Sequence, residues 1–324
     1  MINQTLLDIL ALNREGLMKS NSTALGILSI IRKNYHDLYD EECILSLSLN
    51  ESIARMIYHA DYDRSIAISR AILERFPDTE YAYYVCRHLA VIGRCQALSG
   101  SAVEAAHTLA RAYDMIESGM IRSDDILRLS ADILHDRAMN NMMSGGTPDI
   151  AVQYLEQALT IIEHTDYQMC KGVSLMGLGN IRYSEGKVHD ALDYYLKAEQ
   201  IFDEESNFSN WASISSNIGL CHMNLGYFQM AEKYLTRSLS LRRKIGNSDE
   251  ISISFFNLSL LYEMKGNLDK AILNMIACRS NASRSVNKKI YDDSVLYLKS
   301  LIEKNGGKYD SLFVREQEVY AHAL

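Results

Sequence analysis

Small and apolar residues recur at a fixed interval from residue 146 to residue 271 of this chain of 324 residues. Ala151, Ala191, Ala231 and Ala271 follow one another at intervals of 40 residues, and a glycine stands five positions before each of them. Self-similarity with a period of roughly 20–50 residues is typical of stacked repeats, in which no single unit buries its own hydrophobic face. The pattern therefore predicts a solenoid that grows by adding units, rather than one globular core.

Each unit reads as a helix, a tight turn and a second helix, most clearly over residues 175–198. Gly186 marks the turn, because the residue just past a helix C-terminus often takes a left-handed conformation that costs glycine little. After the turn, Ala191, Tyr195 and Ala198 recur at steps of four and three, which places them on one face of the second helix. Gly179, before the turn, lets a neighbouring helix approach closely.

The same pattern extends in both directions from this unit. With Gly146 taken as the turn residue of an earlier unit, seven helix pairs are predicted around residues 6–31, 62–77, 93–112, 146–158, 175–198, 217–238 and 255–278. Low proline content supports an all-helical chain, since only Pro77 and Pro148 are present.

Residues 288–304 are expected to form a solvated capping helix, because terminal repeats need a polar outer face. Its charged residues fall on the outside, and the positions expected on the inside are Ile290, Val295, Leu296, Leu298 and Leu301. The tail beyond Gly307 fits either one more helix or a linker. Three segments result: 1–44, a degenerate first repeat or N-terminal cap; 45–287, the solenoid; and 288–324, the capping helix and tail.

The segment from Asn257 to Ala271 reads Asn-Leu-Ser-x-x-Tyr-x-x-x-Gly-x-Leu-x-x-Ala, which closely resembles the tetratricopeptide repeat signature. The resemblance covers roughly residues 45–280 and implies a right-handed, all-α solenoid of about seven helix pairs plus a C-terminal capping helix. The family unit is typically about 34 residues long. The longer, 40-residue units of this chain resemble those of bacterial regulatory proteins and of polarity adaptors.

Charge and composition narrow the class of function. Apolar residues make up 48% of the chain and charged residues 23%, which is ordinary for a folded soluble protein. The formal net charge of −8 argues against a nucleic-acid partner. No apolar run approaches the roughly 18 residues of a membrane span. The six cysteines show no CxxC spacing and the N-terminus has no basic signal region, so we expect a reducing, cytoplasmic location.

No catalytic constellation is apparent in the sequence. The phosphate-loop, nucleophile-elbow, HExxH and dinucleotide-binding motifs are all absent. Cys86 with His88, and Cys221 with His222, have spacings that do not share a helix face, so a four-ligand zinc site cannot be assembled locally. The sequence therefore predicts no enzyme, no cofactor and no metal.

In tetratricopeptide proteins the first helix of each pair lines a concave groove, which receives a protein or peptide partner. Carried over by position, the resemblance places these residues in the groove: Asn140, Met143, Met176, Asn180, Tyr183, Ser216, Asn217, Met223, Asn224, Phe256 and Asn257, together with Asp136. Asparagine suits an extended peptide backbone, and methionine suits adaptable apolar pockets. Residues 206–231 contain no charged side chain, consistent with cover by neighbours or by a ligand. Packing within the solenoid alone is an equal alternative for these residues.

The leading hypothesis is a non-catalytic binding module, a scaffold or sensor in a cytoplasmic regulatory system. A second hypothesis is a peptide or ligand receptor that controls a separate or fused output domain, in transcription or cyclic-nucleotide signalling. An enzyme is the third and weakest. The lysines and arginines that clamp a partner's carboxylate in chaperone-binding members are missing at Met176, Asn180 and Ser216, which argues against that partner. The oligomeric state is open, and a homodimer is compatible with the sequence.

Overall fold

The computed structural model describes residues 2–18, 22–34, 40–77, 79–121, 123, 125–202, 208–283, 288–306 and 309. Within these ranges the chain is helical, with one short 3-10 helix (Thr79–Tyr81) and no strand. Contacts divide it into two compact units, Met1–Phe208 and Ser209–Leu324, a boundary that falls inside the predicted segment 45–287. No helix of the described ranges is long and apolar enough to cross a membrane.

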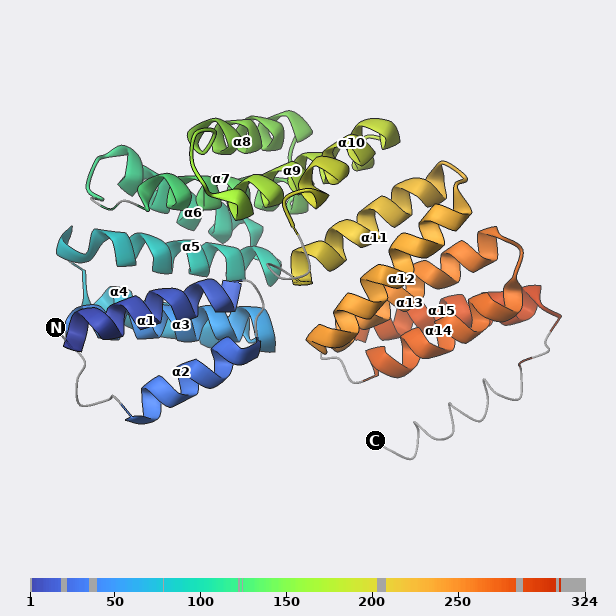
Figure 1. The fold of residues 1–324 in the computed structure, drawn as a ribbon, viewed down its shortest axis with the longest axis horizontal. Helices are drawn as coiled ribbons and strands as arrows, with labels where there is room; N and C mark the ends of the chain where they lie inside the picture. Colours follow the sequence, from blue (N-terminus) through green and yellow to red (C-terminus); the bar gives the residue numbers. More distant parts are fainter. Residues whose placement is uncertain are drawn as a thin grey trace. The chain divides into compact units, whose positions relative to one another are not determined.

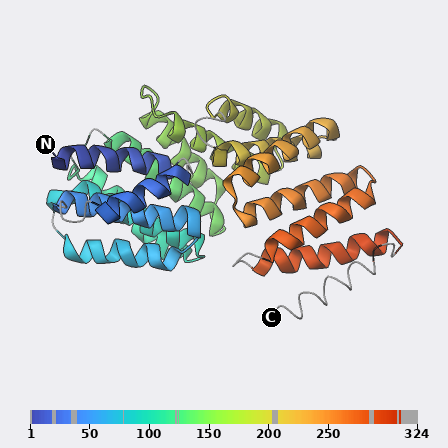
Figure 2. The same ribbon diagram turned by 60° about the horizontal axis from the view of Figure 1, so that its bottom comes forward.

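Unit 1 contains ten helices (Figure 1): α1 (Ile2–Met18), α2 (Ser22–Asn34), α3 (Glu41–His59), α4 (Tyr62–Arg75), α5 (Ala82–Leu98), α6 (Ala102–Glu117), α7 (Ile126–Met143), α8 (Pro148–Ile161), α9 (Gln168–Ser184) and α10 (Val188–Glu199). Consecutive helices pack as pairs, from α1 with α2 to α9 with α10. The first helices of successive pairs also contact one another, which gives the row α1, α3, α5, α7 and α9 (Figure 2).

Unit 2 contains α11 (Phe208–Asn224), α12 (Phe228–Ile245), α13 (Ser248–Met264), α14 (Leu268–Ala282) and α15 (Lys288–Lys304). Ser238 of α12 donates a hydrogen bond to the Ala212 carbonyl of α11, and α13 packs on α14. The final helix packs on α14, with Leu298 and Leu301 buried. Seven helix pairs and a cap confirm the predicted all-α repeat fold. Leu296 is a correction: it is 70% exposed rather than inward-facing, because Leu298 and Leu301 fill the contact with α14.

Close approach within a pair depends on a missing side chain. A Cβ added to Gly179 would lie 2.5 Å from the ring of Tyr195, and Tyr195 is only 2% exposed. Its hydroxyl donates to Oδ1 of Asn180 over 2.8 Å. Ala191 and Ala198 of the same helix are fully buried. Gly179 thus lets the ring of Tyr195 pack directly on the backbone of α9, and the close approach of the two helices agrees with the spacing of the small residues.

The turn after α7 differs from the others by one residue. Gly186, Gly226 and Gly266 have positive φ and stand five residues before the buried alanine of the next helix. After α7 the left-handed residue is Gly145, with φ of 74°, six residues before Ala151. Gly146, expected to be the turn residue, therefore follows it. In consequence, residues of α7 are equivalent to those of α9 at a distance of 41 rather than 40 positions.

Candidate peptide-binding face

Charged side chains line a small cavity between the first helices of unit 1. We call the surface of α3, α5, α7 and α9 that faces away from the second helices the first-helix face. A cavity of about 30 Å³, enough for a water molecule, lies between three of these helices. It is lined by Ile53, Met56, Arg87, Ala90, Val91, Arg94, Leu129, Asp132 and Asp136.

Helix periodicity places the charged residues of this cavity together. Arg87 and Arg94 are seven residues apart on α5, two turns of one face, and Asp132 and Asp136 are four apart on α7. Because α5 and α7 pack side by side, the basic and acidic pairs meet across the contact. Neither pair forms a local sequence motif, and the sequence analysis did not identify either pair. The sequence signal for each pair is the helical spacing of two like charges.

An ion pair joins the two helices. Nε of Arg94 donates to Oδ1 of Asp136 over 2.7 Å, and the Asp136 side chain is 6% exposed. Burial raises the pKa of Asp136 to about 6, although the Arg94 guanidinium opposes that shift. The other carboxylate oxygen, Oδ2, is buried and has no hydrogen-bond partner among the described residues. A buried acceptor without a partner is costly, so this oxygen is suited to a donor supplied from outside.

Two neighbours complete this polar patch. Sγ of Cys170, from α9, donates to Oδ1 of Asp132 over 3.1 Å, and burial raises the pKa of that thiol above its ordinary range. Burial and the nearby Arg94 lower the pKa of His135 to about 4, so its imidazole is neutral at pH 7. Its Nδ1 is buried without a partner in the described part of the chain. The patch offers hydrogen-bonding atoms, but among described residues no group of three His, Cys, Asp or Glu is placed to hold a metal ion.

The residues predicted for the groove occupy varied positions in unit 1. The amide of Asn140 donates to the Ala102 carbonyl over 3.0 Å and lies in a separate pocket with Arg137 and Tyr154. Met143 is 57% exposed at the end of α7. The one-residue difference in the following turn explains this placement, because it rotates α7 residues by about 100° relative to a strict 40-residue register.

On α9, the predicted residues Met176, Asn180 and Tyr183 are half-buried. Asn180 already accepts a hydrogen bond from Tyr195, so part of its side chain serves the helix pair. Asp136, by contrast, does lie on the first-helix face beside Arg94. Of the predicted set in unit 1, it is the side chain that the structure joins to the charged patch.

In unit 2, two predicted residues are brought together. Nδ2 of Asn257 donates to Oγ of Ser216 over 3.1 Å, and both side chains are buried. Phe256 stacks on Tyr297 of α15 with ring centroids 5.4 Å apart, and Met223 is buried in the core. Asn217 is half-buried, and Asn224 is exposed. Their role toward a partner remains a prediction.

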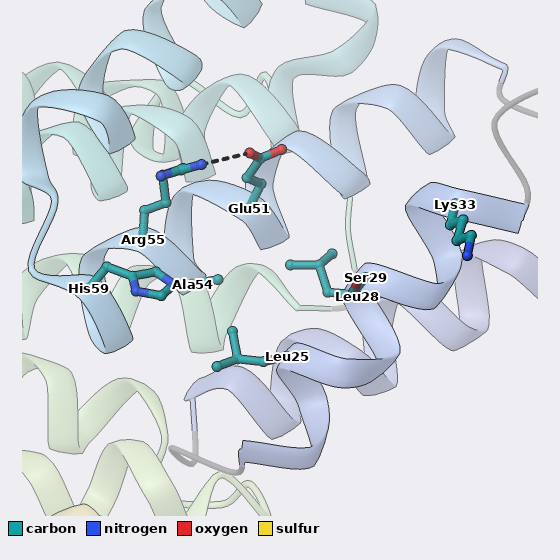
Figure 3. A pocket seen from close by; sticks show the side chains of 8 residues that line it. All are labelled: Leu25, Leu28, Ser29, Lys33, Glu51, Ala54, Arg55 and His59. Carbon is teal, nitrogen blue, oxygen red and sulfur yellow. Dashed lines mark ion pairs between the residues drawn. The ribbon is translucent and has the colours of Figure 1, made fainter. Parts of the chain in front are cut away.

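A wider pocket of about 380 Å³ lies between α2 and α3 (Figure 3). Leu25 and Leu28 of α2 lie toward Ala54 of α3, whereas Arg55 and Glu51 of α3 point toward each other. The Arg55 guanidinium lies 3.6 Å from Glu51 and 3.2 Å from Asp61, so its charge is already balanced within the chain. This pocket offers no free charge to a ligand through Arg55, unlike the carboxylate oxygen of Asp136.

Comparison with known proteins agrees with the geometry of the helix pairs. Residues 212–275 match the family described as tetratricopeptide repeat. These residues are tetratricopeptide repeats. Among curated protein sequences none matches it significantly. The matched range covers most of α11, all of α12 and α13 and half of α14.

Solved structures of bacterial regulators share the fold of these tetratricopeptide repeats over most of the chain. A Rap protein complexed with Competence and Sporulation Factor is 14% identical, with a TM-score of 0.66 over 99% of this chain and 96% of that one. The apo quorum sensor NprR from B. thuringiensis is 14% identical, with a TM-score of 0.61 over 99% and 98%. Aspartyl phosphate phosphatase F from Bacillus subtilis is 15% identical, with a TM-score of 0.53 over 85% and 74%. At these identities the likeness shows the fold alone.

Proposed function

We propose that this tetratricopeptide-repeat chain is a non-catalytic module that binds a peptide or protein segment, as a scaffold or sensor in a cytoplasmic regulatory system. The segment lies along the first-helix face of unit 1 and is linked to Oδ2 of Asp136 through a water molecule in the cavity beside that oxygen. The single observation that carries the proposal is this buried carboxylate oxygen, which has no partner in the described residues. The shared fold of a Rap protein that was crystallised with Competence and Sporulation Factor supports it.

The chemistry of the face favours a segment with a donor group over an acidic one. The two arginines and two aspartates of the cavity balance in charge, and Arg94 is already paired with Asp136. A backbone N–H or an amide supplies the donor that Oδ2 of Asp136 lacks, whereas a carboxylate would add a further acceptor. Met56 and Leu129 supply apolar contact beside the charged pair. No catalytic motif appears in the sequence, and the residues of the face can position a bound segment without reacting with it.

A pull-down from cell lysate with mass spectrometry would identify the bound segment. Asp136→Asn, which keeps the shape of the side chain but removes its charge, should weaken binding of the identified segment at least tenfold, about 1.4 kcal/mol. Asp114→Asn, at an exposed carboxylate of α6, is the matched control and should bind like the natural chain. Equal affinities of both variants would exclude the first-helix face as the docking surface.

The alternative is a receptor that controls a separate or fused output domain. The likeness to the quorum sensor NprR over nearly the full length of both chains favours it. The same pull-down distinguishes the two: a scaffold retains two or more proteins together, whereas a receptor exchanges an output protein when the small segment is added.

A further inference from the structure

A second pocket of unit 1 lies at the N-terminal ends of α3, α5 and α7, beside α1, and encloses about 520 Å³. This volume is within the range of small-molecule sites, roughly 300–1,000 Å³. It shares no lining residue with the cavity beside Asp136. The pocket therefore stands independently of the proposed function, and the two can be tested separately.

A buried cation that makes no ion pair with the described residues lines this pocket. Arg14 is 9% exposed. Its Nε donates to Oδ1 of Asn50 over 2.9 Å, and its Nη2 donates to Oγ of Ser46 over 2.5 Å. Nη1 makes no hydrogen bond, and no carboxylate forms an ion pair with Arg14, among the described residues. Buried charges are ordinarily paired, so an anionic group in the pocket would supply the missing partner.

The wall of the pocket next to Arg14 is acidic and aromatic, and Arg14 interacts electrostatically with Tyr83, Tyr84 and Asp125 of this wall. Glu42, Glu80 and Asp125 line it with Tyr83 and Tyr84, whose rings stand at 79° with centroids 5.4 Å apart. The hydroxyl of Tyr83 donates to Asp125 over 3.4 Å, and that of Tyr84 donates to Glu42 over 3.3 Å. Carboxylates and the faces of aromatic rings both attract organic cations, and the Arg87 guanidinium already lies 5.9 Å from the centroid of the Tyr83 ring. This wall is suited to an ammonium or guanidinium group.

Only a ligand that carries both an anionic and a cationic group can pair with Arg14 and with the carboxylates of the pocket at once. Four carboxylates and one guanidinium line the pocket, a net charge of −3, so a simple anion is repelled. A simple cation, such as a polyamine, would leave Arg14 unpaired. A carboxylate joined to a cationic chain matches the anion site, the cation site and the sign of the net charge together.

We propose that this pocket binds a basic α-amino acid, free or as the C-terminal residue of a peptide, with its carboxylate on Arg14 and its side-chain cation on the acidic, tyrosine-lined wall. Arg14 keeps its charge at neutral pH, because burial and the neighbouring Arg87 lower its pKa only to about 10. The site gives the chain a means to respond to a small nitrogen-rich metabolite or to a basic peptide end.

The test is a calorimetric titration of the full chain with five defined probes. L-Arginine should bind, whereas agmatine, which lacks the carboxylate, and L-citrulline, which lacks the side-chain charge, should bind at least tenfold more weakly. Gly-Gly-Arg and its C-terminal amide distinguish the sources: tighter binding of the free-acid peptide than of L-arginine assigns a peptide end. Agmatine binding as tightly as L-arginine would overturn the role of Arg14. No heat from either L-arginine or Gly-Gly-Arg at millimolar concentration would overturn the proposal.

Variants at exposed positions avoid a failure to fold. Glu80→Gln combined with Asp125→Asn should weaken L-arginine at least tenfold and leave the melting temperature unchanged, since both side chains are exposed. Glu74→Gln combined with Glu104→Gln removes the same charge outside the pocket and should bind like the natural chain. Equal weakening by both pairs would show that net charge alone attracts arginine, and would contradict a built site.

Discussion

The same position of the repeat is used in opposite ways by the two units. Asp136 and Asn257 each stand nine residues before the left-handed glycine that ends their helix, Gly145 and Gly266. Each reaches back to the first helix of the preceding pair. In unit 1 the contact is an ion pair with Arg94, and in unit 2 it is a neutral hydrogen bond with Ser216. The repeat fixes where the contact is made, and the sequence decides whether it carries charge.

The neutral contact is complete, whereas the charged one is not. Asn257 and Ser216 are buried without a charged partner at the contact. Asp136 keeps one oxygen without a partner, and its pKa is raised by burial. We therefore expect the contact of Asp136 to be more sensitive to substitution, to pH and to a ligand than the contact of Asn257.

The largest effect is expected when the cation of the charged contact is removed. Arg94→Met leaves Asp136 buried without its ion pair and should lower the free energy of unfolding by about 3 kcal/mol at pH 7, since breaking a buried pair typically costs about 3–5 kcal/mol. Urea unfolding measures it. The double variant Arg94→Met with Asp136→Leu should recover most of the loss, and a double variant as unstable as the single one would contradict the ion-pair explanation.

Acid should act on unit 1 through a buried histidine. His88 is fully buried, with Nδ1 3.0 Å from Ser69 Oγ and Nε2 3.4 Å from the Leu45 carbonyl oxygen. Burial lowers its pKa to about 4. Between about pH 6.5 and pH 4 the unfolded chain binds a proton that the folded chain does not, so stability falls as pH falls through that window, by about 3 kcal/mol in total.

His88→Gln isolates this contribution, because glutamine does not titrate. The stability advantage of the natural chain over this variant should shrink as the pH falls from 6.5 to 4. This difference also removes the effect of Asp136, whose raised pKa acts in the opposite direction, favouring the folded state as pH falls. A difference that stays constant with pH would show that His88 is charged in the folded chain.

The smallest effect is expected at the neutral contact. Asn257→Ala removes one hydrogen bond and should destabilise unit 2 by about 1 kcal/mol, with no dependence on pH between 4 and 7. Ser216→Ala should cost a similar amount, and the double variant should cost less than the sum. Lys197→Ala, at an exposed side chain of α10, is a control that should change stability by less than about 0.5 kcal/mol. A loss of stability in Asn257→Ala as large as that in Arg94→Met would contradict the difference between the neutral and the charged contact.

The fold could be predicted because its determinants are local and periodic. The left-handed turn at Gly186, the close contact at Gly179 and the buried face of Ala191, Tyr195 and Ala198 all lie within one unit. The charged contact could not be predicted, because Arg94 and Asp136 lie 42 residues apart on different helices and neither is part of a motif. The pocket beside Arg14 gathers residues from α1, α3, α5 and the segments before α5 and α7, so no sequence window contains it.

The extra residue in the turn after α7 changes which side chains of that helix occupy each position of the repeat. One inserted residue turns the preceding helix by about 100° relative to the helix that follows, while the buried alanine of α8 stays in place. A sequence profile built on a strict 40-residue period would therefore compare the wrong residues in this unit: it would align Asn140 with Asn180, whereas the structure aligns Met139 with Asn180. Lengthening or shortening a turn by one residue is consequently a route by which such a protein can change which side chains it presents, with its packed core unchanged.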